Sequence, residues 1–356
     1  MKILYGVQGT GNGHLTRARA MQKAFKEAGV SVDWVFSGRP RESYFDMETF
    51  GDFRCFKGLS FSINAGQIDP IKTVTEASFK LLLKDVGTLD LRGYDLIISD
   101  FEPVVAWAAK VKKVPCIGLG HQYAFFHDIP KVKNALASYA IMKWFAPVNF
   151  AIGLHWHNFG QQILPPIIEQ NLSPKQATSK KALVYLPFED TQDVIETLNS
   201  LPFDFILHSK DFAPGTYNNV QVKGFSVTGF HESLSLCDSV ICNAGFELAS
   251  ECLSLGKKLL IKPLKGQIEQ TSNALAIEQL QYGYVTQEID AKSICLFLTT
   301  AKSTQVSYPN VSRLIAQWIL EYPDKPFSDL VEKSWADVVV QSDLIEDNNV
   351  TPVRVA

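Results

Sequence analysis

The chain has 356 residues, of which 46% are hydrophobic and 20% charged, and its formal net charge is −3. This length is too great for one ordinary core and suits two domains of roughly 150–180 residues each. The near balance of 34 basic and 37 acidic residues argues against a protein that binds nucleic acid through its overall charge.

The first half of the chain alternates predicted strands and helices. Residues 2–8 predict a buried strand, which runs through a glycine loop into an amphipathic helix that ends at Gly29. A strand over 30–36 follows at once, and strand–helix–strand with short links is the unit of a parallel sheet. The pattern continues with predicted strands over 95–99, 115–119 and 150–155 and predicted helices over 103–113 and 131–146.

Residues 160–181 lack clear periodicity, which predicts a linker, and a second alternating array follows it. We therefore predict an α/β protein with two doubly wound parallel-sheet domains facing across a cleft. Helices from about 310 to 335 close the chain, and a polar tail follows Gln341. The second array has predicted strands over 182–187, 203–208, 220–224, 239–242, 257–262 and near 284, and predicted helices over 190–201, 231–236, 246–255 and 268–281.

Neither the cysteines nor the hydropathy point to an exported or membrane-spanning protein. The six cysteines form no CxxC pair, which predicts buried free thiols in a reducing compartment and no metal site. The apolar run at the N-terminus is too short for a signal sequence, and we find no stretch of eighteen uncharged apolar residues. We expect a cytoplasmic protein, with peripheral contact at the inner face of the membrane as an additional option.

The loop Gly9-Thr10-Gly11-Asn12-Gly13-His14 follows the first predicted strand. Parallel sheets bind ligands at the carboxyl ends of their strands, where helix N-termini present free N–H groups. Alternate glycines allow close approach to an anion and positive φ values. The loop therefore predicts a phosphate ligand held by Gly11, Asn12 and Gly13.

Two common phosphate-binding motifs do not fit this loop. A dinucleotide-binding GxGxxG motif starting at Gly9 needs Gly or Ala where the chain has His14. It also needs an acidic residue after the second strand, where Phe36 is followed by Ser37, Gly38 and Arg39. The Gly-Lys-Ser/Thr ending of a P-loop is missing as well.

His14 is the candidate general base. The start of a helix favours the neutral, proton-accepting imidazole, although the residue could also serve only to shape the loop. Asp100 ends a second predicted strand at the same edge of the sheet and could orient the imidazole. Glu102 could orient His14 or act as the base itself, and either acid could instead cap the helix before Pro103. We rank His14 with Asp100 first and Glu102 second.

A second motif runs from Cys242 to Glu251 and continues through Gly256, Pro263 and the segment 267–273. Over 242–274, and less closely over 1–29, the chain resembles GT-B glycosyltransferases of the UDP-glycosyltransferase superfamily. The likeness includes the N-acetylglucosaminyltransferase that completes the peptidoglycan lipid precursor. The chain departs from that pattern at Phe246 and Glu247, where a small or hydroxyl residue is common.

The resemblance implies the donor-binding residues. Free N–H groups at Asn243, Ala244 and Gly245 would bind the diphosphate without a metal, which agrees with their place before a helix. Glu251 would bind the ribose, with Glu247 one helical turn earlier as the alternative. The family takes its uracil contacts from loop backbone, here 224–230. The remaining implied donor-binding residues are Phe246 and the sugar contacts Glu269, Gln270 and Asn273.

The resemblance also implies a different role for each domain. Residues 1–165 would form the acceptor-binding and catalytic-loop domain, 166–181 the linker, 182–320 the nucleotide-sugar-binding domain, and 321–356 a closing helix and polar tail. The expected activity is metal-independent and cofactor-free transfer of a sugar from a nucleotide sugar, expected to be UDP-linked, with inversion. The acceptor would be a hydroxyl of a glycan, glycolipid or other molecule in cell-surface synthesis. The alternatives are a UDP-sugar 2-epimerase and a non-catalytic nucleotide-sugar-binding protein.

Acceptor recognition is expected from loops of the first domain. His121, Gln122 and Tyr123 follow a predicted strand and combine aromatic and hydrogen-bonding groups, which suits stacking on a sugar, unless they are ordinary loop packing. Residues 57–70 form a second loop, which is expected to be mobile. Trp144 and a group of lysines could contact an anionic membrane or simply form a solvated face. These lysines are Lys110, Lys112, Lys113, Lys131, Lys133 and Lys143.

Overall fold

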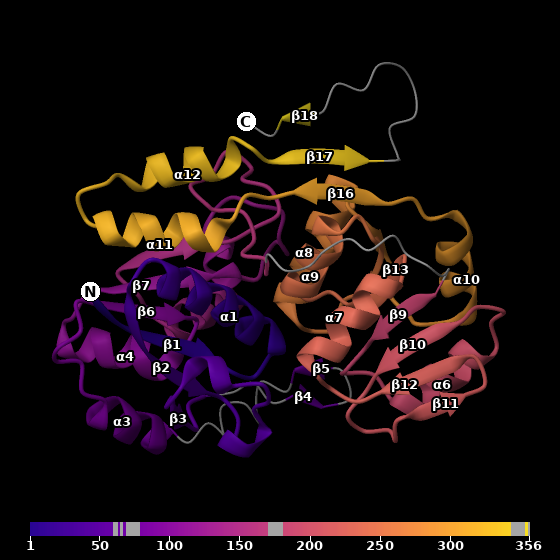
Figure 1. The fold of residues 1–356 in the computed structure, drawn as a ribbon, viewed down its shortest axis with the longest axis horizontal. Helices are drawn as coiled ribbons and strands as arrows, with labels where there is room; N and C mark the ends of the chain where they lie inside the picture. Colours follow the sequence, from indigo (N-terminus) through magenta and orange to yellow (C-terminus); the bar gives the residue numbers. More distant parts are fainter. Residues whose placement is uncertain (60–62, 65–66, 69–78, 170–180, 343–352, 355–356) are drawn as a thin grey trace.

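The computed structural model describes residues 1–59, 63–64, 67–68, 79–169, 181–342 and 353–354. They form two α/β domains that lie side by side, each built around its own sheet (Figure 1). Almost all neighbouring strands in these two sheets are parallel. The predicted pair of doubly wound domains is confirmed.

In the N-terminal domain the strand order is β3-β2-β1-β6-β7-β8. The order reverses between β1 and β6, and ligands of such sheets bind in the crevice beyond the carboxyl ends of the strands at this point. Val7 near the end of β1 pairs with Asp100 at the end of β6. The elements are β1 (Lys2–Gln8), α1 (Asn12–Glu27), β2 (Ser31–Ser37), β3 (Arg54–Phe56), α3 (Phe79–Thr88), β6 (Leu96–Asp100), α4 (Pro103–Lys112), β7 (Cys116–Gly120), η3 (His121–Phe126), α5 (Leu136–Phe145) and β8 (Phe150–Gly153).

The C-terminal domain repeats this plan with the strand order β11-β12-β10-β9-β13-β14-β15. Its order reverses between β9 and β13, which places its ligand crevice beyond the carboxyl ends of these two strands. Strand β11 is antiparallel to its neighbour. The elements are β9 (Ala182–Tyr185), α6 (Thr191–Asn199), β10 (Phe205–His208), β11 (Gly215–Tyr217), β12 (Val220–Lys223), α7 (Val227–Leu236), β13 (Ser239–Asn243), α8 (Phe246–Ser254), β14 (Lys258–Lys262), α9 (Ile268–Leu280), β15 (Tyr284–Val285) and α10 (Ala291–Thr300).

The last helices return to the N-terminal domain, as Figure 1 shows. Helix α11 (Val311–Glu321) packs on α1, and its Trp318 ring lies 6.1 Å from the ring of Phe150 in β8. Trp335 of α12 (Phe327–Trp335) donates a 2.7 Å hydrogen bond to the carbonyl of Ile163. The return therefore begins with α11, about ten residues before the predicted boundary at 321.

A small antiparallel sheet accompanies this return. It consists of β16 (Thr304–Ser307), β17 (Val339–Ser342) and β18 (Val353–Arg354). The expected polar tail thus contains a short strand, and its residues 343–352 lie outside the described residues.

The two domains share part of one apolar core. Trp156, which follows β8, is 1% exposed, and its ring centroid lies 5.0 Å from that of Phe246 in α8. Its indole N–H donates to the Ser250 hydroxyl across 2.8 Å. Replacing a buried Trp by Ala typically costs about 3–5 kcal/mol, so this contact stabilises a closed arrangement of the domains.

Most predicted elements are found within a few residues of their expected bounds. The helix expected over 231–236 starts at Val227 instead, because the Ser226 hydroxyl caps it through the Gly229 N–H at 3.1 Å. Strands β3 and β11 are each three residues long and too short for an alternating pattern. Of the expected loop over 57–70, residues 63–64 and 67–68 are described as a strand pair, and residues 60–62, 65–66 and 69–70 lie outside the described residues.

The predicted linker is described only up to residue 169 and from 181. None of the helices in the described part of the chain combines the length and apolar character needed to span a bilayer.

Candidate functional site

The glycine loop lies at the boundary of the two domains, and its glycines fit close packing. Gly9, Gly11 and Gly13 all lack positive φ values, so none of them uses the left-handed conformation that glycine permits. A Cβ at Gly9 would overlap the Tyr44 hydroxyl, and a Cβ at Gly13 would lie 2.7 Å from Cγ of Glu247. At these two positions glycine makes room for protein side chains, and one of those side chains comes from the other domain.

His14 and Asp100 meet at the edge of the N-terminal sheet. Nδ1 of His14 lies 2.8 Å from Oδ1 of Asp100, which is fully buried at the end of β6. A carboxylate can only accept, so the Nδ1–H donates to it and the lone pair is left on Nε2. Within the described residues Nε2 has no hydrogen-bond partner, and the side chain is 12% exposed. The predicted spatial pairing of these residues is present, whereas the catalytic role of His14 stays a prediction.

Arg17 completes this group and was not predicted. Its Nε and Nη2 atoms donate to the two Asp100 oxygens at 2.7 and 2.5 Å, and the side chain is 2% exposed. Nη2 also lies 2.9 Å from Nδ1 of His14, and because both atoms are donors in this tautomer, the pair is a close contact and the Asp100 oxygen between them accepts from both. Burial opposes the charge of Asp100, but Arg17 and His14 beside it hold the pKa of this carboxyl below its ordinary value. Its position three residues after His14 on one helix face was the available signal.

Glu102 does not share this arrangement. Its carboxylate caps α4, accepting the N–H groups of Val104 and Val105 at 2.8 and 2.6 Å and the Ser37 hydroxyl at 2.6 Å. It is fully buried, and burial raises its pKa to about 7. The structure contradicts a base facing the cleft at this position and matches the capping alternative.

The opposite wall of the cleft is the start of α8. The N–H of Ala244 donates to the Lys262 carbonyl at 3.1 Å and that of Gly245 to the Asn243 carbonyl at 2.7 Å, so the prediction of free N–H groups at 244 and 245 is wrong. Among the described residues no side chain caps α8. The unpaired N–H groups therefore belong to the first helical turn, Phe246 to Leu248.

Asn243, at the end of β13, is also held by protein atoms. Its Nδ2 donates to Glu189 at 3.2 Å and to the Lys262 carbonyl at 3.3 Å, while its buried Oδ1 has no partner within the described residues.

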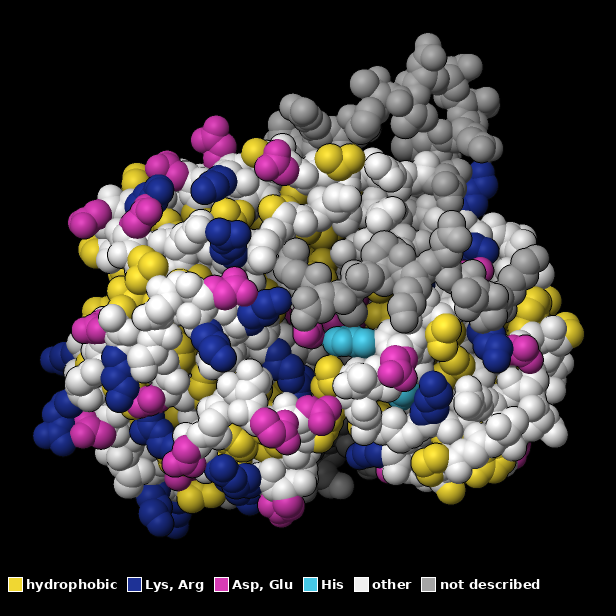
Figure 2. Space-filling model, viewed as in Figure 1, with side chains coloured by type: hydrophobic (Ala, Val, Ile, Leu, Met, Phe, Trp, Pro, Cys, Tyr) yellow, Lys and Arg dark blue, Asp and Glu magenta, His cyan; other side chains and the backbone are white. Residues whose placement is uncertain are grey.

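A pocket lies between the glycine loop and the C-terminal domain. Glu251 is 6% exposed, lines this pocket, and has a pKa raised to about 8 by burial and by the neighbouring Glu247. Figure 2 shows histidine side chains at the surface along the boundary between the domains, with basic and acidic side chains beside them. The pocket is lined by Asn12, Gly13, Thr16, Arg19, Phe45, Tyr185, His208, Phe225, Ser226, Val227, Phe230, His231, Glu247, Leu248 and Glu251.

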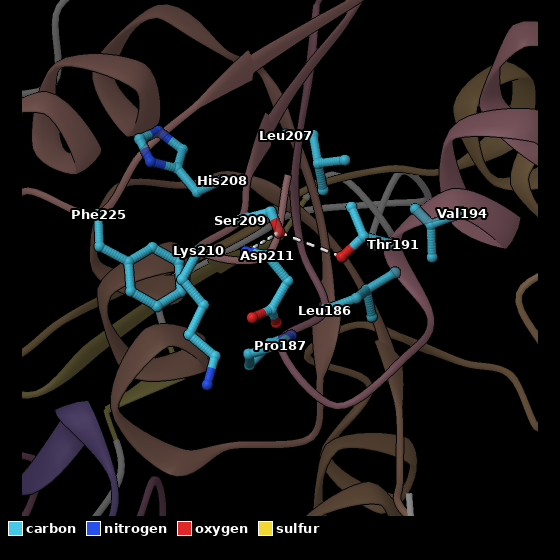
Figure 3. A pocket seen from close by; sticks show the side chains of 10 residues that line it. All are labelled: Leu186, Pro187, Thr191, Val194, Leu207, His208, Ser209, Lys210, Asp211 and Phe225. Carbon is cyan, nitrogen blue, oxygen red and sulfur yellow. Dashed lines mark hydrogen bonds between the residues drawn. The ribbon is translucent and has the colours of Figure 1, made fainter. Parts of the chain in front are cut away.

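A smaller hollow adjoins this pocket at the carboxyl ends of β9 and β10 (Figure 3). The two share His208 and Phe225. In the hollow the hydroxyls of Thr191 and Ser209 lie 3.1 Å apart, joining the start of α6 to the loop after β10. The sequence did not single out this part of the second domain.

The predicted acceptor residues contact the predicted sugar-binding residues. His121 Nε2 lies 2.7 Å from Oδ1 of Asn273, and Gln122 donates to both Glu269 oxygens at 3.2 Å. The ring of His121 also stacks on Phe246 with centroids 3.9 Å apart. These contacts join η3 of the first domain to α8 and α9 of the second.

Two residues predicted to contact substrate are occupied within their own domains. Tyr123 is 1% exposed, and its hydroxyl donates to the Ala146 carbonyl at 3.3 Å, so it packs in the core and cannot stack on a sugar. Oε1 of Gln270 accepts the Leu264 N–H at 3.1 Å, which fixes the loop before α9.

Comparison with known proteins adds the family. A model described as glycosyl transferase family 1 matches residues 1–301. A curated relative from Methanosarcina acetivorans, named as an uncharacterized glycosyltransferase, is 30% identical over 129 residues, which are 35% of this chain and 32% of that protein. The chain therefore matches about a third of that relative's length.

Solved glycosyltransferases share the fold. SnogD from Streptomyces nogalater is 15% identical, with a TM-score of 0.51 over 94% of this chain and 96% of that chain. SsfS6 from Streptomyces sp. SF2575, complexed with thymidine diphosphate, is 11% identical, with a TM-score of 0.55 over 89% and 99%. The rhamnosyltransferase SpnG, complexed with thymidine diphosphate, is 12% identical, with a TM-score of 0.55 over 94% and 96%. These similarities confirm the predicted GT-B fold, and the finer likeness to the peptidoglycan enzyme stays a prediction.

Proposed function

The chain belongs to glycosyl transferase family 1, and we propose that it is a glycosyltransferase that uses His14 to activate an acceptor hydroxyl for attack on a UDP-linked sugar. One observation carries this proposal. A histidine anchored through Nδ1 by a buried carboxylate lies beside a pocket between two doubly wound domains. Such a histidine presents Nε2 as a proton acceptor, which general-base catalysis requires.

The proposed reaction is a single displacement. Nε2 of His14 takes the proton of the acceptor hydroxyl, and the freed oxygen attacks the anomeric carbon of the donor sugar. The bond from that carbon to the phosphate oxygen breaks, and the nucleoside diphosphate leaves with the bonding electrons. Attack opposite the leaving group inverts the anomeric centre. The proton resides on His14, whose imidazolium is stabilised by Asp100.

The donor is proposed to lie along the pocket wall of the second domain. The N–H groups in the first turn of α8, which have no partner among the described residues, and the positive end of the helix dipole suit the diphosphate and the charge that develops on it. Glu251, buried at the pocket wall, suits the ribose hydroxyls. Phe225 and Phe230 offer aromatic surfaces for the base. No metal or cofactor enters this proposal.

For the acceptor we propose a hydroxyl of a glycan or glycolipid in cell-surface synthesis, reached at the inner face of the membrane. Leu136, Ile141 and Trp144 on one side of α5 are 82%, 55% and 44% exposed. The surface continues onto α4, because the Trp144 ring lies 5.5 Å from that of Trp107. The Lys110 ammonium lies over the Trp107 ring, 4.9 Å from its centroid. An apolar helix face beside lysines suits anionic lipid headgroups.

The activity assay follows UDP release from UDP-sugars with and without candidate hydroxyl acceptors. His14→Ala should lower turnover by about 10²–10⁴-fold, whereas His127→Ala, a half-exposed histidine in the loop after η3, should leave it near wild type. Normal turnover of His14→Ala would refute the proposed base. Epimer without UDP release would favour a 2-epimerase, and stabilisation by UDP without any product would favour a binding protein. Stabilisation by TDP or GDP but not UDP would overturn the donor assignment.

Membrane contact is tested separately by co-sedimentation with phosphatidylglycerol and phosphatidylcholine vesicles. Binding to the anionic vesicles alone, lost at high salt and in an Ile141→Ser/Trp144→Ala variant, is the expected result. Lys292→Glu, on an exposed position of α10 in the other domain, is the matched control. Absence of wild-type binding to the anionic vesicles would refute this contact.

A further inference from the structure

Arg17 is bonded to both domains at once. Its guanidinium donates through Nε and Nη2 to the two oxygens of Asp100, which belongs to the N-terminal sheet. Through Nη1 it donates to Oε1 of Glu247, which belongs to α8 of the C-terminal domain. A planar guanidinium holds its donors in fixed directions, so Asp100 and Glu247 are set relative to each other by one side chain. The same side chain therefore joins the orienting carboxylate of His14 to the proposed donor-binding helix.

The Glu247 side chain crosses the domain boundary and packs over Gly13 of the glycine loop. Its side chain passes over Gly13 so closely that a Cβ there would lie 2.7 Å from Cγ and 3.2 Å from Cβ of Glu247. Glu247 is the second residue of α8, and its side chain can reach Arg17 only when α8 lies against α1. Contact between Glu247 and Arg17 thus marks the closed arrangement.

The charges of this group balance only after His14 has taken a proton. With neutral His14, Arg17 carries one positive charge against the two carboxylates of Asp100 and Glu247. Burial raises the pKa of Glu247 to about 7, Arg17 opposes this shift and Asp100 adds to it, so the second negative charge is complete only above neutral pH. The other ionisable groups that face the cluster are Tyr5 of β1, His121 and Tyr123 of η3, Glu251 of α8 and Glu269 of α9. Among these named groups only His121 could carry a positive charge, and burial lowers its pKa.

We propose that Arg17 and Glu247 form an interdomain latch, which brings a second carboxylate to the His14–Asp100 pair when the cleft closes and so makes His14 a stronger base in the closed state. In an open cleft Glu247 would move away from Arg17. The positive charge of Arg17 would then be opposed by Asp100 alone, and the attraction between Asp100 and the imidazolium of His14 would be weaker. Proton abstraction is thereby favoured once the donor helix is in place. Both residues are positioning residues, and the inference rests on the proposed role of His14.

Glu247→Gln tests the latch, because it keeps the shape and removes the charge. Loss of a negative charge near His14 destabilises the imidazolium, so the acidic limb of the kcat–pH profile should move to lower pH by about one unit. Above neutral pH, where Glu247 is ionised, we expect kcat to fall by up to about tenfold, as stabilisation of the protonated base is lost. Ser250→Ala is the matched control: it removes another interdomain hydrogen bond from α8, that of the Trp156 indole, without touching the charged group. Its pH profile should match wild type.

A second measurement separates the latch from the proposed function. Small-angle scattering with and without UDP reports closure without any turnover, and it is carried out in His14→Ala as well as in the wild-type background. Glu247→Gln should give a larger radius of gyration than wild type in both backgrounds. An unchanged pH profile together with an unchanged radius in folded Glu247→Gln would overturn the latch while leaving His14 in its role. Full turnover in His14→Ala would refute the base, and with it the pH effect, even if the radius still reported the latch.

Discussion

Asp100→Asn is the sharpest perturbation of the proposed base. In the wild type the carboxylate accepts from His14 at 2.8 Å and from Arg17 at 2.7 and 2.5 Å. An amide of the same size has one acceptor atom and one donor group, so at least one Arg17 N–H must face the new NH₂ group. The imidazole also loses the charge that holds its proton on Nδ1 and stabilises the imidazolium.

The expected magnitude follows from this loss. We expect kcat to fall by about 10²–10⁴-fold, the range that positioned general-base catalysis contributes. The donor KM should change little, because Asp100 is fully buried and has no surface for the donor. Breaking one partner of a buried ion pair also costs about 3–5 kcal/mol of folding free energy, so the melting temperature should fall as well.

The assay is UDP release at several donor and acceptor concentrations, well below the melting temperature of the variant. Circular dichroism and nucleotide binding confirm that the protein assayed is folded. Asp95→Asn is the control, since Asp95 lies just before the same strand and accepts the exposed Lys2 N–H at 2.7 Å. Wild-type kcat in folded Asp100→Asn would refute the idea that this carboxylate positions the base.

Further predictions concern the cap, the pocket and the glycine loop. Glu102→Gln should keep turnover near wild type and lower the urea unfolding free energy by about 1–2 kcal/mol; lost turnover in a folded variant would make Glu102 the base. Glu251→Ala should raise the calorimetric Kd for UDP roughly 10–100-fold, and an unchanged Kd would contradict a ribose contact. The pKa of Glu251 is raised to about 8, so ionisation of this carboxyl lowers the stability of the fold as pH rises from about 4.5 to 8. The melting temperature of Glu251→Gln should therefore fall less over this pH range than that of the wild type, and an equal fall in both proteins would contradict the raised pKa. Gly13→Ala should lower turnover far more than Gly11→Ala, whose Cβ would meet nothing nearer than 3.8 Å; equal effects would argue against Glu247 packing at Gly13.

The fold was predictable because its signals are local. Strands such as β1 and β13 are short apolar runs buried on both faces, and the helices after them repeat apolar residues every three to four positions. The pairing of His14 with Asp100 was also predictable, because carboxyl ends of neighbouring parallel strands meet at one edge. In both cases a topological rule turns sequence position into spatial position.

That rule applies within one sheet and does not predict contacts between the two domains. Arg17 and Glu247 are 230 residues apart, and their contact depends on how two separately folded domains close. Within its own helix each has an ordinary explanation, Arg17 as a polar residue of an amphipathic helix and Glu247 as an acid in a first turn. No local period in the sequence predicts that the Arg17 guanidinium and the Glu247 carboxylate meet across the domain boundary.

The loop after β7 is a second case in which contacts between the domains could not be predicted from the local sequence. His121 and Gln122 have the composition of an exposed recognition loop, yet they are 1% and 5% exposed because Asn273 and Glu269 of the second domain cover them. In an isolated domain, polar side chains at the carboxyl end of a parallel strand are accessible to a ligand. Here the second domain covers them and provides their hydrogen-bond partners. An acceptor could reach these side chains only if the domains separate, so the same closure that brings Glu247 to Arg17 removes His121 from acceptor binding. Acceptor contacts in the closed state must therefore come from residues that keep their exposure at the cleft, beside Nε2 of His14.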